Sequence, residues 1–347
     1  MASYEDFIPV NLLTGFLGSG KTTLLKRLLE SPQLANTAVL INEFGEIGLD
    51  HLLLETVDNE TVVLQSGCIC CTIRTDLKNA IVSLYDKSRR GIIPSFDRMV
   101  IETTGLADPA PIVFTLRGDP MIRHHFRLGN IVTTVDAVNA ERELTTNDET
   151  RKQIAVADRI VITKTDIADP LAVERLSATL RDLNATAKIY DAQTDRIEAD
   201  DLLAHDIYDP QTKSEEVQSW LDQESKRTGH AHAHDRNRHA DDIVTFCVIE
   251  DRPLDWTAFG IWLSMLVHAH GENVLRVKGL INVAGLPSPV VVNGVQHIIH
   301  PPTHLDRWPS DDMRSRIIFV VRGLDPKLLQ RSLAAFNRLA KAGDLSS

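Results

Sequence analysis

An eight-residue segment near the N-terminus is Gly15-Phe16-Leu17-Gly18-Ser19-Gly20-Lys21-Thr22, and it matches the P-loop pattern G-x-x-x-x-G-K-[ST]. A short apolar run at 8–13 precedes the segment, and a run typical of a helix at 23–29 follows it. A strand, a glycine-rich turn and a helix are the context that this pattern requires. We therefore expect a loop that binds phosphate between a buried strand and a helix.

The chemistry of such a loop comes mainly from its backbone. Glycines let the chain curve closely around phosphate oxygens with successive N–H groups pointing inward, and the following helix adds its positive N-terminal end. Lys21 is expected to reach the β- and γ-phosphates, and the Thr22 hydroxyl is expected to bind Mg²⁺. The predicted nucleotide contacts in this segment are Gly15, Gly18, Ser19, Gly20, Lys21, Thr22 and Thr23.

The composition of the 347-residue chain is ordinary for a globular protein, with 43% hydrophobic and 24% charged residues, and the length favours two domains. The formal net charge of -11 argues against nucleic acid or an anionic membrane as the main partner. No apolar run reaches the ~18 residues of a membrane span, and the N-terminal residues lack the form of a signal peptide. We expect a cytoplasmic location.

Three of the four cysteines, Cys68, Cys70 and Cys71, lie within four residues, whereas Cys247 is alone in a predicted strand and is expected in the core. Adjacent cysteines rarely form an unstrained disulfide, and three thiols this close favour a soft divalent ion such as Zn²⁺. A tetrahedral site would still lack a ligand, which Glu46, a histidine or a water could supply. A set of small buried apolar residues is the alternative.

The acidic segment after the predicted strand 37–42 carries Glu43, Glu46 and Asp50. In a P-loop protein this loop is well placed to face the γ-phosphate. The three carboxylates are candidates for binding Mg²⁺, for positioning the attacking water or for a second metal, and a solvated acidic loop is the alternative.

A further predicted strand, 98–102, ends in Glu102 and is followed by Thr103-Thr104-Gly105. An acidic residue at the end of an apolar strand is where a P-loop protein places its Walker B acid, so Glu102 is expected to act on Mg²⁺ or its water shell. The N–H of Gly105 could sense the γ-phosphate, and glycine suits a loop that switches.

The predicted strand 159–162 leads into Thr163-Lys164-Thr165-Asp166, a T-K-x-D sequence where GTPases usually have N-K-x-D. The Asp166 carboxylate can accept hydrogen bonds from N1–H and the 2-amino group of guanine, which adenine cannot offer. Lys164 can lie along the base plane. Thr163 replaces the usual asparagine, which leaves the base selectivity open. The backbone N–H of Ala192, after a later strand, could complete the base pocket.

Five motifs occur in an order typical of one family: G-x-x-x-x-G-K-T at 15–22, N-E-F-G-E at 42–46, C-x-C-C at 68–71, E-T-T-G at 102–105 and T-K-x-D at 163–166. Over almost its whole length the chain resembles the CobW-like GTPases, a group related to the nickel-insertion GTPases of hydrogenase and urease maturation. The C-x-C-C between the P-loop and E-T-T-G is the specific part of the resemblance, because a P-loop alone is generic.

The resemblance implies a GTPase that uses GTP/GDP and Mg²⁺ and delivers Zn²⁺ or Co²⁺ to a client protein, or assists cobalamin synthesis or nitrile hydratase activation. By similarity, Cys68, Cys70 and Cys71 bind the delivered metal, with Glu46 as a further candidate ligand. Lys21, Glu43 and Glu102 are the expected catalytic residues. We expect slow intrinsic GTP hydrolysis, because the sequence shows no Arg or Gln at a position that indicates a catalytic role. The oligomeric state is left open between a monomer and a dimer that depends on nucleotide or metal.

The expected fold is α/β: a P-loop NTPase domain at 1–211 with a mostly parallel sheet flanked by helices, and a smaller C-terminal α+β domain at 242–347. The polar segment 212–241 between them is predicted to be a linker. Four histidines within it, His230, His232, His234 and His239, can capture divalent metal weakly, and a solvated linker is the alternative.

Two other functions fit a P-loop protein. A small-molecule kinase or ligase would transfer phosphate to an acceptor and would have no use for the thiols. A metal-sequestering protein with a secondary nucleotide site would hold its metal in every nucleotide state.

Overall fold

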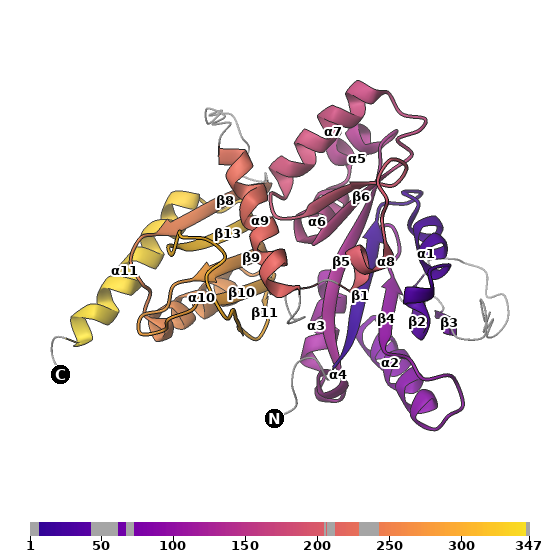
Figure 1. Ribbon diagram of the computed structural model, residues 1–347, viewed down its shortest axis with the longest axis horizontal. Coiled ribbons are helices and arrows are strands. Elements are labelled where there is room, and N and C mark those ends of the chain that lie inside the picture. The colour runs from indigo at the N-terminus through magenta and orange to yellow at the C-terminus, as the bar shows by residue number, and fades with distance from the viewer. Residues whose placement is uncertain are drawn as a thin grey trace. The chain divides into compact units, whose positions relative to one another are not determined.

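The computed structural model describes residues 7–42, 62–66, 73–204, 206, 212–228 and 243–344 (Figure 1). The chain divides into two compact units. Unit 1 consists of Met1–Ala178 and Ala187–Asp209, and unit 2 consists of Thr179–Thr186 and Pro210–Ser347.

Unit 1 is built on a parallel sheet. Its described residues form seven strands in the order β3-β2-β4-β1-β5-β6-β7, and each neighbouring pair is parallel. The strands are β1 (Ile8–Gly15), β2 (Thr37–Asn42), β3 (Val62–Ser66), β4 (Arg98–Glu102), β5 (Phe126–Asp136), β6 (Arg159–Thr163) and β7 (Lys188–Asp191). Because parallel strands end at the same edge, the residues after β1, β4, β5 and β6 meet there.

Among the described residues, helices follow most of these strands, as parallel pairing requires. They are α1 (Lys21–Leu29), the 3-10 helix η2 (Pro32–Leu34), α2 (Ile73–Arg89), α3 (Ala110–Gly118), α4 (Pro120–His125), α5 (Ala140–Thr146), α6 (Asp148–Val156), α7 (Pro170–Leu183) and α8 (Ala199–Leu203). Leucines of α1 and α8 pack on Val100 and Val132 of the sheet, whereas α3 and α6 contact β5 elsewhere. The prediction of a P-loop NTPase fold is confirmed. Among the described helices, none combines the length and the apolar character needed to span a membrane.

The pairing of β1 with β5 contains one irregularity. Val10 pairs with Leu128 and Leu12 pairs with Ile131, so β5 has one more residue than β1 between these two pairs. The Oδ1 atom of Asn11, a residue with no exposed surface, accepts the Asn130 N–H at 2.8 Å and so takes the place of a ladder partner. This bulge sets the register of all the β5 residues that follow.

Unit 2 contains an antiparallel sheet, with the order β11-β10-β9-β13-β8 and with β12 paired to β10. Its strands are β8 (Ile243–Glu250), β9 (Val274–Ile281), β10 (Val290–Val295), β11 (Ile298–Ile299), β12 (Thr303–His304) and β13 (Ser315–Arg322). Its helices include α9 (Lys213–Thr228), α10 (Trp256–His270) and α11 (Pro326–Asp344). Phe319 of β13 packs with Trp262 of α10 and Leu333 of α11 in one core. The prediction of a C-terminal α+β domain is confirmed.

One part of the predicted linker has regular structure. Residues 213–228 form α9, in which Val217, Trp220 and Leu221 are buried. The spacing of these three side chains, i, i+3 and i+4, gives one apolar helix face within an otherwise polar segment. The four histidines predicted to capture metal lie outside the described residues.

Candidate nucleotide-binding site

The P-loop connects β1 to α1 through backbone conformations that favour glycine. Gly15 has φ 141° and Gly20, the residue before α1, has φ 87°. A Cβ at Gly15 would collide with Thr134 at the end of β5, so the loop lies directly against that strand. Ser19 is fully buried and its hydroxyl lies 2.7 Å from the Thr134 hydroxyl. The loop therefore has a fixed shape before any ligand is considered.

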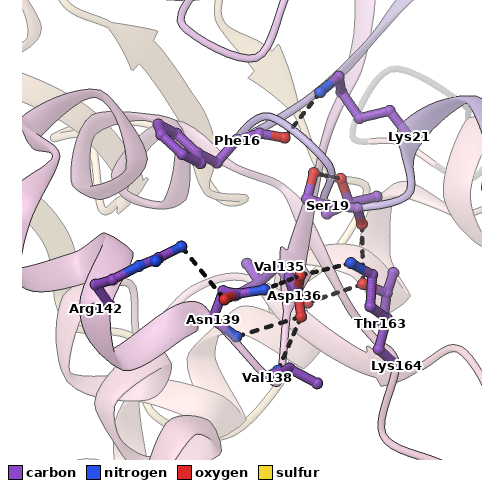
Figure 2. A network of polar contacts seen from close by, with 11 residues as sticks. Phe16, Ser19, Lys21, Val135, Asp136, Val138, Asn139, Arg142, Thr163 and Lys164 are labelled. Carbon is purple, nitrogen blue, oxygen red and sulfur yellow. Dashed lines mark hydrogen bonds and ion pairs between the residues drawn. The ribbon is translucent and has the colours of Figure 1, made fainter. Parts of the chain in front are cut away.

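Lys21 and Thr22 are the first two residues of α1. The Nζ of Lys21 donates to the carbonyl oxygens of Gly15 at 2.9 Å and Phe16 at 3.0 Å, and Figure 2 shows its side chain lying back over the loop. Lys21 is only 8% exposed, so its ammonium group stays close to the site that the loop encloses.

Thr22 faces the predicted Walker B acid. Its hydroxyl donates to Oε1 of Glu102 at 2.5 Å, and Glu102, the last residue of β4, is buried. A hydroxyl and a carboxylate held together are oxygen ligands of the kind that Mg²⁺ prefers. These two residues therefore fit the ion that the sequence implies, and that ion would neutralise charge on phosphate oxygens.

The turn after β4 packs on the P-loop. A Cβ at Gly105 would collide with the backbone N and Cα of Leu17. The Thr103 hydroxyl contacts the Thr14 hydroxyl of β1 at 2.9 Å. The Nε2 of Gln153, on α6, donates to the carbonyls of Gly105 at 3.1 Å and Ala107 at 2.9 Å. Gln153 belongs to none of the sequence motifs, although a glutamine directly before the apolar run 154–157 was a usable signal.

The T-K-T-D loop is tied to the P-loop. The Thr163 hydroxyl lies 2.9 Å from the carbonyl oxygen of Ser19 and 3.3 Å from that of Val135, and Thr163 is buried (Figure 2). In this arrangement Thr163 joins two loops through its hydroxyl. Asp166 is exposed and Lys164 has φ 59°, a left-handed backbone conformation unusual for a lysine.

Asp136, the last residue of β5, holds Lys164. Its Oδ2 accepts hydrogen bonds from Lys164 Nζ at 2.6 Å and Asn139 Nδ2 at 2.8 Å, and its Oδ1 accepts the Val138 N–H at 2.9 Å (Figure 2). Burial acts to raise the pKa of Asp136, but the hydrogen bonds from Lys164, Asn139 and Val138 outweigh it and hold the pKa below its ordinary value. Asp136 is a further site residue that the motifs did not identify.

Ala192 requires a correction. Its N–H, expected to face a base, donates instead to the Ile162 carbonyl at 2.8 Å, because β7 pairs with β6 up to this point. Its carbonyl accepts from Arg27 of α1 at 2.7 Å. Nearby, Asp191 accepts from the Thr165 hydroxyl at 2.6 Å. Ala192 thus lies beside the T-K-T-D loop, but its N–H is used inside the sheet.

Glu143 of α5 is a buried carboxylic acid close to this site. Burial raises its pKa, the charge of Asp136 raises it further, and the charges of Arg142, Lys164 and Lys21 oppose the shift. The electrostatic coupling to Lys21 and Lys164 associates Glu143 with both the phosphate side and the base side of the site.

The candidate ligands of the delivered metal are a separate set of residues. Glu43, Glu46, Cys68, Cys70 and Cys71 lie outside the described residues. Within the described part of the chain, there is no group of three or more His, Cys, Asp or Glu side chains suited to a metal ion. Cys247 lies on β8 and is partly buried.

Comparison with known proteins agrees with this geometry. Residues 9–191 match the model of the CobW/HypB/UreG nucleotide-binding domain. The chain belongs to this family. Residues 243–337 match the cobalamin synthesis protein cobW C-terminal domain, so both units have a counterpart in CobW proteins.

Relatives match over nearly the whole length. The zinc chaperone YjiA of Escherichia coli is 32% identical over 95% of this chain and 99% of its own. The zinc-regulated GTPase metalloprotein activator 1 of Schizosaccharomyces pombe is 31% identical over 92% of this chain and 83% of its own. Zn(II)-bound YjiA GTPase from E. coli aligns with a TM-score of 0.69 at 27% identity over 95% of this chain and 99% of that chain. A Zn(II)-bound YjiA variant with alanine at one glutamate and two cysteines aligns equally well.

Proposed function

We propose that this CobW-family protein is a GTP-hydrolysing metallochaperone that binds Zn²⁺ or Co²⁺ at Cys68, Cys70 and Cys71, with Glu46, and transfers the metal to a client protein or cofactor pathway. Relatives named as zinc chaperones and a zinc-regulated GTPase support the coarse function. The three thiols supply the soft ligands that Zn²⁺ prefers.

The nucleotide is assigned to the two loops at the carboxyl edge of the parallel sheet. The backbone of Gly15, Gly18, Ser19 and Gly20, with Thr23, surrounds the phosphates, and Lys21 moves from its carbonyl partners to the β- and γ-phosphates. Asp166 reads guanine, with Lys164 along the base. Thr163 serves as the link between the two loops, which its contact with Ser19 supports. Ala192 contributes its position beside the base loop.

Hydrolysis is the attack of water on the γ-phosphorus: the new P–O bond forms as the bond to the β–γ bridging oxygen breaks, and GDP and phosphate leave. Glu102 and Thr22 are assigned to Mg²⁺, Lys21 to the developing charge, and Glu43 to orienting the water.

One hydrogen bond supports the proposed coupling between the nucleotide state and metal binding. Thr22 of the P-loop hydrogen-bonds to Glu102, the residue from which the E-T-T-G turn begins, and Gly105 of that turn packs on Leu17. Loss of the γ-phosphate therefore acts directly on this turn. The thiols lie in sequence between the P-loop and this turn, so we assign metal release to the change that follows hydrolysis.

A zinc titration tests the proposal. The protein is loaded with GDP or with a non-hydrolysable GTP analogue, and the affinity for the tightest Zn²⁺ ion is measured in each state, for the wild type, the combined variant Cys68→Ser, Cys70→Ser, Cys71→Ser, and the single control variant Cys247→Ser. We expect an affinity difference of about tenfold or more between the two nucleotide states. We also expect that the combined variant abolishes tight binding and that the control leaves it intact.

The tightest ion must be measured rather than total bound zinc. The Zn(II)-bound YjiA variant lacks one glutamate and two cysteines, so in that protein bound zinc alone does not locate a site. Equal zinc affinity in both nucleotide states would indicate a sequestering protein, and unchanged zinc binding in the combined variant would contradict the proposal. Phosphate transfer from GTP to a small acceptor would favour a kinase or ligase.

A further inference from the structure

We propose that Gln153 is a positioning residue that sets the orientation of the E-T-T-G turn and thereby the preference of the site for GTP over GDP. The side chain of Gln153 is fully buried, and its amide lies against the turn from α6. The inference rests on the proposed role of Gly105 toward the γ-phosphate.

The helix that carries Gln153 is fixed to the sheet. The Thr133 hydroxyl of β5 donates to the Gln153 carbonyl at 3.0 Å, and Ile154, which follows, has no exposed surface. Just after the helix, Asp158 exchanges hydrogen bonds with Ile131 of β5: its N–H donates at 2.8 Å and its Oδ2 accepts at 3.1 Å. The Gln153 side chain therefore projects from a rigid base.

The amide of Gln153 binds both ends of a short turn. Both of its neighbours, the carbonyls of Gly105 and Ala107, are acceptors, so its nitrogen is the atom that faces them. The Ala107 N–H closes the same turn by donating to the Thr104 carbonyl at 3.1 Å. These bonds orient the peptide groups on both sides of Gly105, and Gly105 has no space to shift toward Leu17. The Ala107–Thr104 bond orients the peptide that carries the Gly105 N–H, and Gln153 holds the remainder of the turn in place from α6.

The other end of the amide distinguishes Gln153 from a purely structural side chain. Its Oε1 atom is buried and has no hydrogen-bond partner among the described residues. Burying an amide oxygen without a donor is unfavourable, and an apolar side chain of the same length would avoid it. The two hydrogen bonds that Nε2 donates to the Gly105 and Ala107 carbonyls offset this cost. Oε1 remains available to accept a hydrogen bond from an N–H that the turn presents in another nucleotide state.

The test compares nucleotide affinities of full-length variants. Gln153→Met keeps the length of the side chain and removes both donors. Its control is Thr150→Val, one turn earlier on α6, because Thr150 is also buried and its hydroxyl has no partner among the described residues. We expect Gln153→Met to weaken a non-hydrolysable GTP analogue about tenfold and GDP less than about twofold, with a lower kcat. Thr150→Val should change neither. Equal losses for both nucleotides, or none, would overturn the proposal.

Gln153→Glu gives a second readout that does not depend on Gln153→Met folding well. A protonated carboxyl group can donate to a carbonyl, whereas a carboxylate cannot. The affinity of this variant for the GTP analogue, relative to wild type, should fall as the pH rises, and a constant ratio would contradict the proposal. The zinc titration of the wild type separates the two ideas, because equal zinc affinity in both nucleotide states refutes metal coupling without altering the Gln153 ratios.

Discussion

Buried acidic and basic side chains have different positions in the two sheets. In the parallel sheet of unit 1 the buried carboxylates of the described strands, Glu102 and Asp136, each occupy the last position, as the buried hydroxyl residue Thr163 also does. In the antiparallel sheet of unit 2 they stand within strands, as Arg276 and Lys278 do on β9. Parallel strands all end at one edge and can build a site there, whereas the ends of antiparallel strands alternate between two edges.

This difference separates binding from stability. The strand-end side chains of unit 1 bond mainly to loops, and their replacement should alter nucleotide binding more than folding. The apolar core residues of unit 2 make packing contacts with one another, so their replacement should alter folding alone. Three substitutions test this separation, in order of decreasing expected effect.

Phe319→Ala should give the largest effect, confined to unit 2. Phe319 is fully buried and its ring lies 5.5 Å from that of Phe246 and 6.1 Å from that of Trp262, measured between centroids. We expect a loss of about 3–5 kcal/mol in the free energy of unfolding. All four tryptophans lie between 220 and 308, so tryptophan fluorescence in urea reports on unit 2. At urea concentrations below the unfolding transition, the affinity for a fluorescent GDP should stay within about twofold of wild type. A loss of GDP affinity that accompanies the loss of stability would contradict the separation of binding from stability.

Asp136→Asn should give an intermediate effect, on binding. The variant keeps the shape of the side chain but weakens its hold on Lys164. We expect a loss of about tenfold in GDP affinity, or about 1.4 kcal/mol, because Lys164, which we propose lies along the base, loses the carboxylate that holds it. Isothermal titration calorimetry measures it. The control is Asp148→Asn, which removes an exposed ion pair with Lys152 and should leave the affinity unchanged. If Asp136→Asn destabilises unit 1 but binds GDP normally, Asp136 is structural.

Glu143→Gln should give the smallest effect, and it depends on pH. Because burial raises the folded pKa of Glu143 above its ordinary value of 4.5, the folded state loses stability as the pH rises from 4.5 through the folded pKa. The glutamine variant lacks this loss, so it should be more stable than wild type at pH 8 and should gain nothing at pH 4. Hydrogen exchange of unit 1 amides measures the difference. Glu141→Gln, on the exposed side of α5, should show no such trend.

The sequence was most informative where function depends on neighbours in the chain. The P-loop and the T-K-T-D loop are local motifs, and their strands and helices lie as the apolar runs predicted. Asp136 and Gln153 were missed because their partners are distant: Lys164 is 28 residues from Asp136, and Gly105 is 48 residues from Gln153.

Two other differences have separate physical causes. The apolar face of α9 was hidden because it consists of few side chains within a charged segment. The N–H of Ala192 was considered for the base pocket because the length of β7, which decides its partner in the sheet, cannot be read from composition.

The bulge between β1 and β5 bears on how this chain can evolve. One extra residue in β5 next to Asn11 decides which face Thr134 and Asp136 present, because side chains alternate along a strand. Removing Gly129 would turn both residues away from the P-loop at once, although neither would itself be changed. We therefore expect the chain length across 128–134 to tolerate change less well than the identity of most residues there. Insertions and deletions should be confined to the loops beyond this strand.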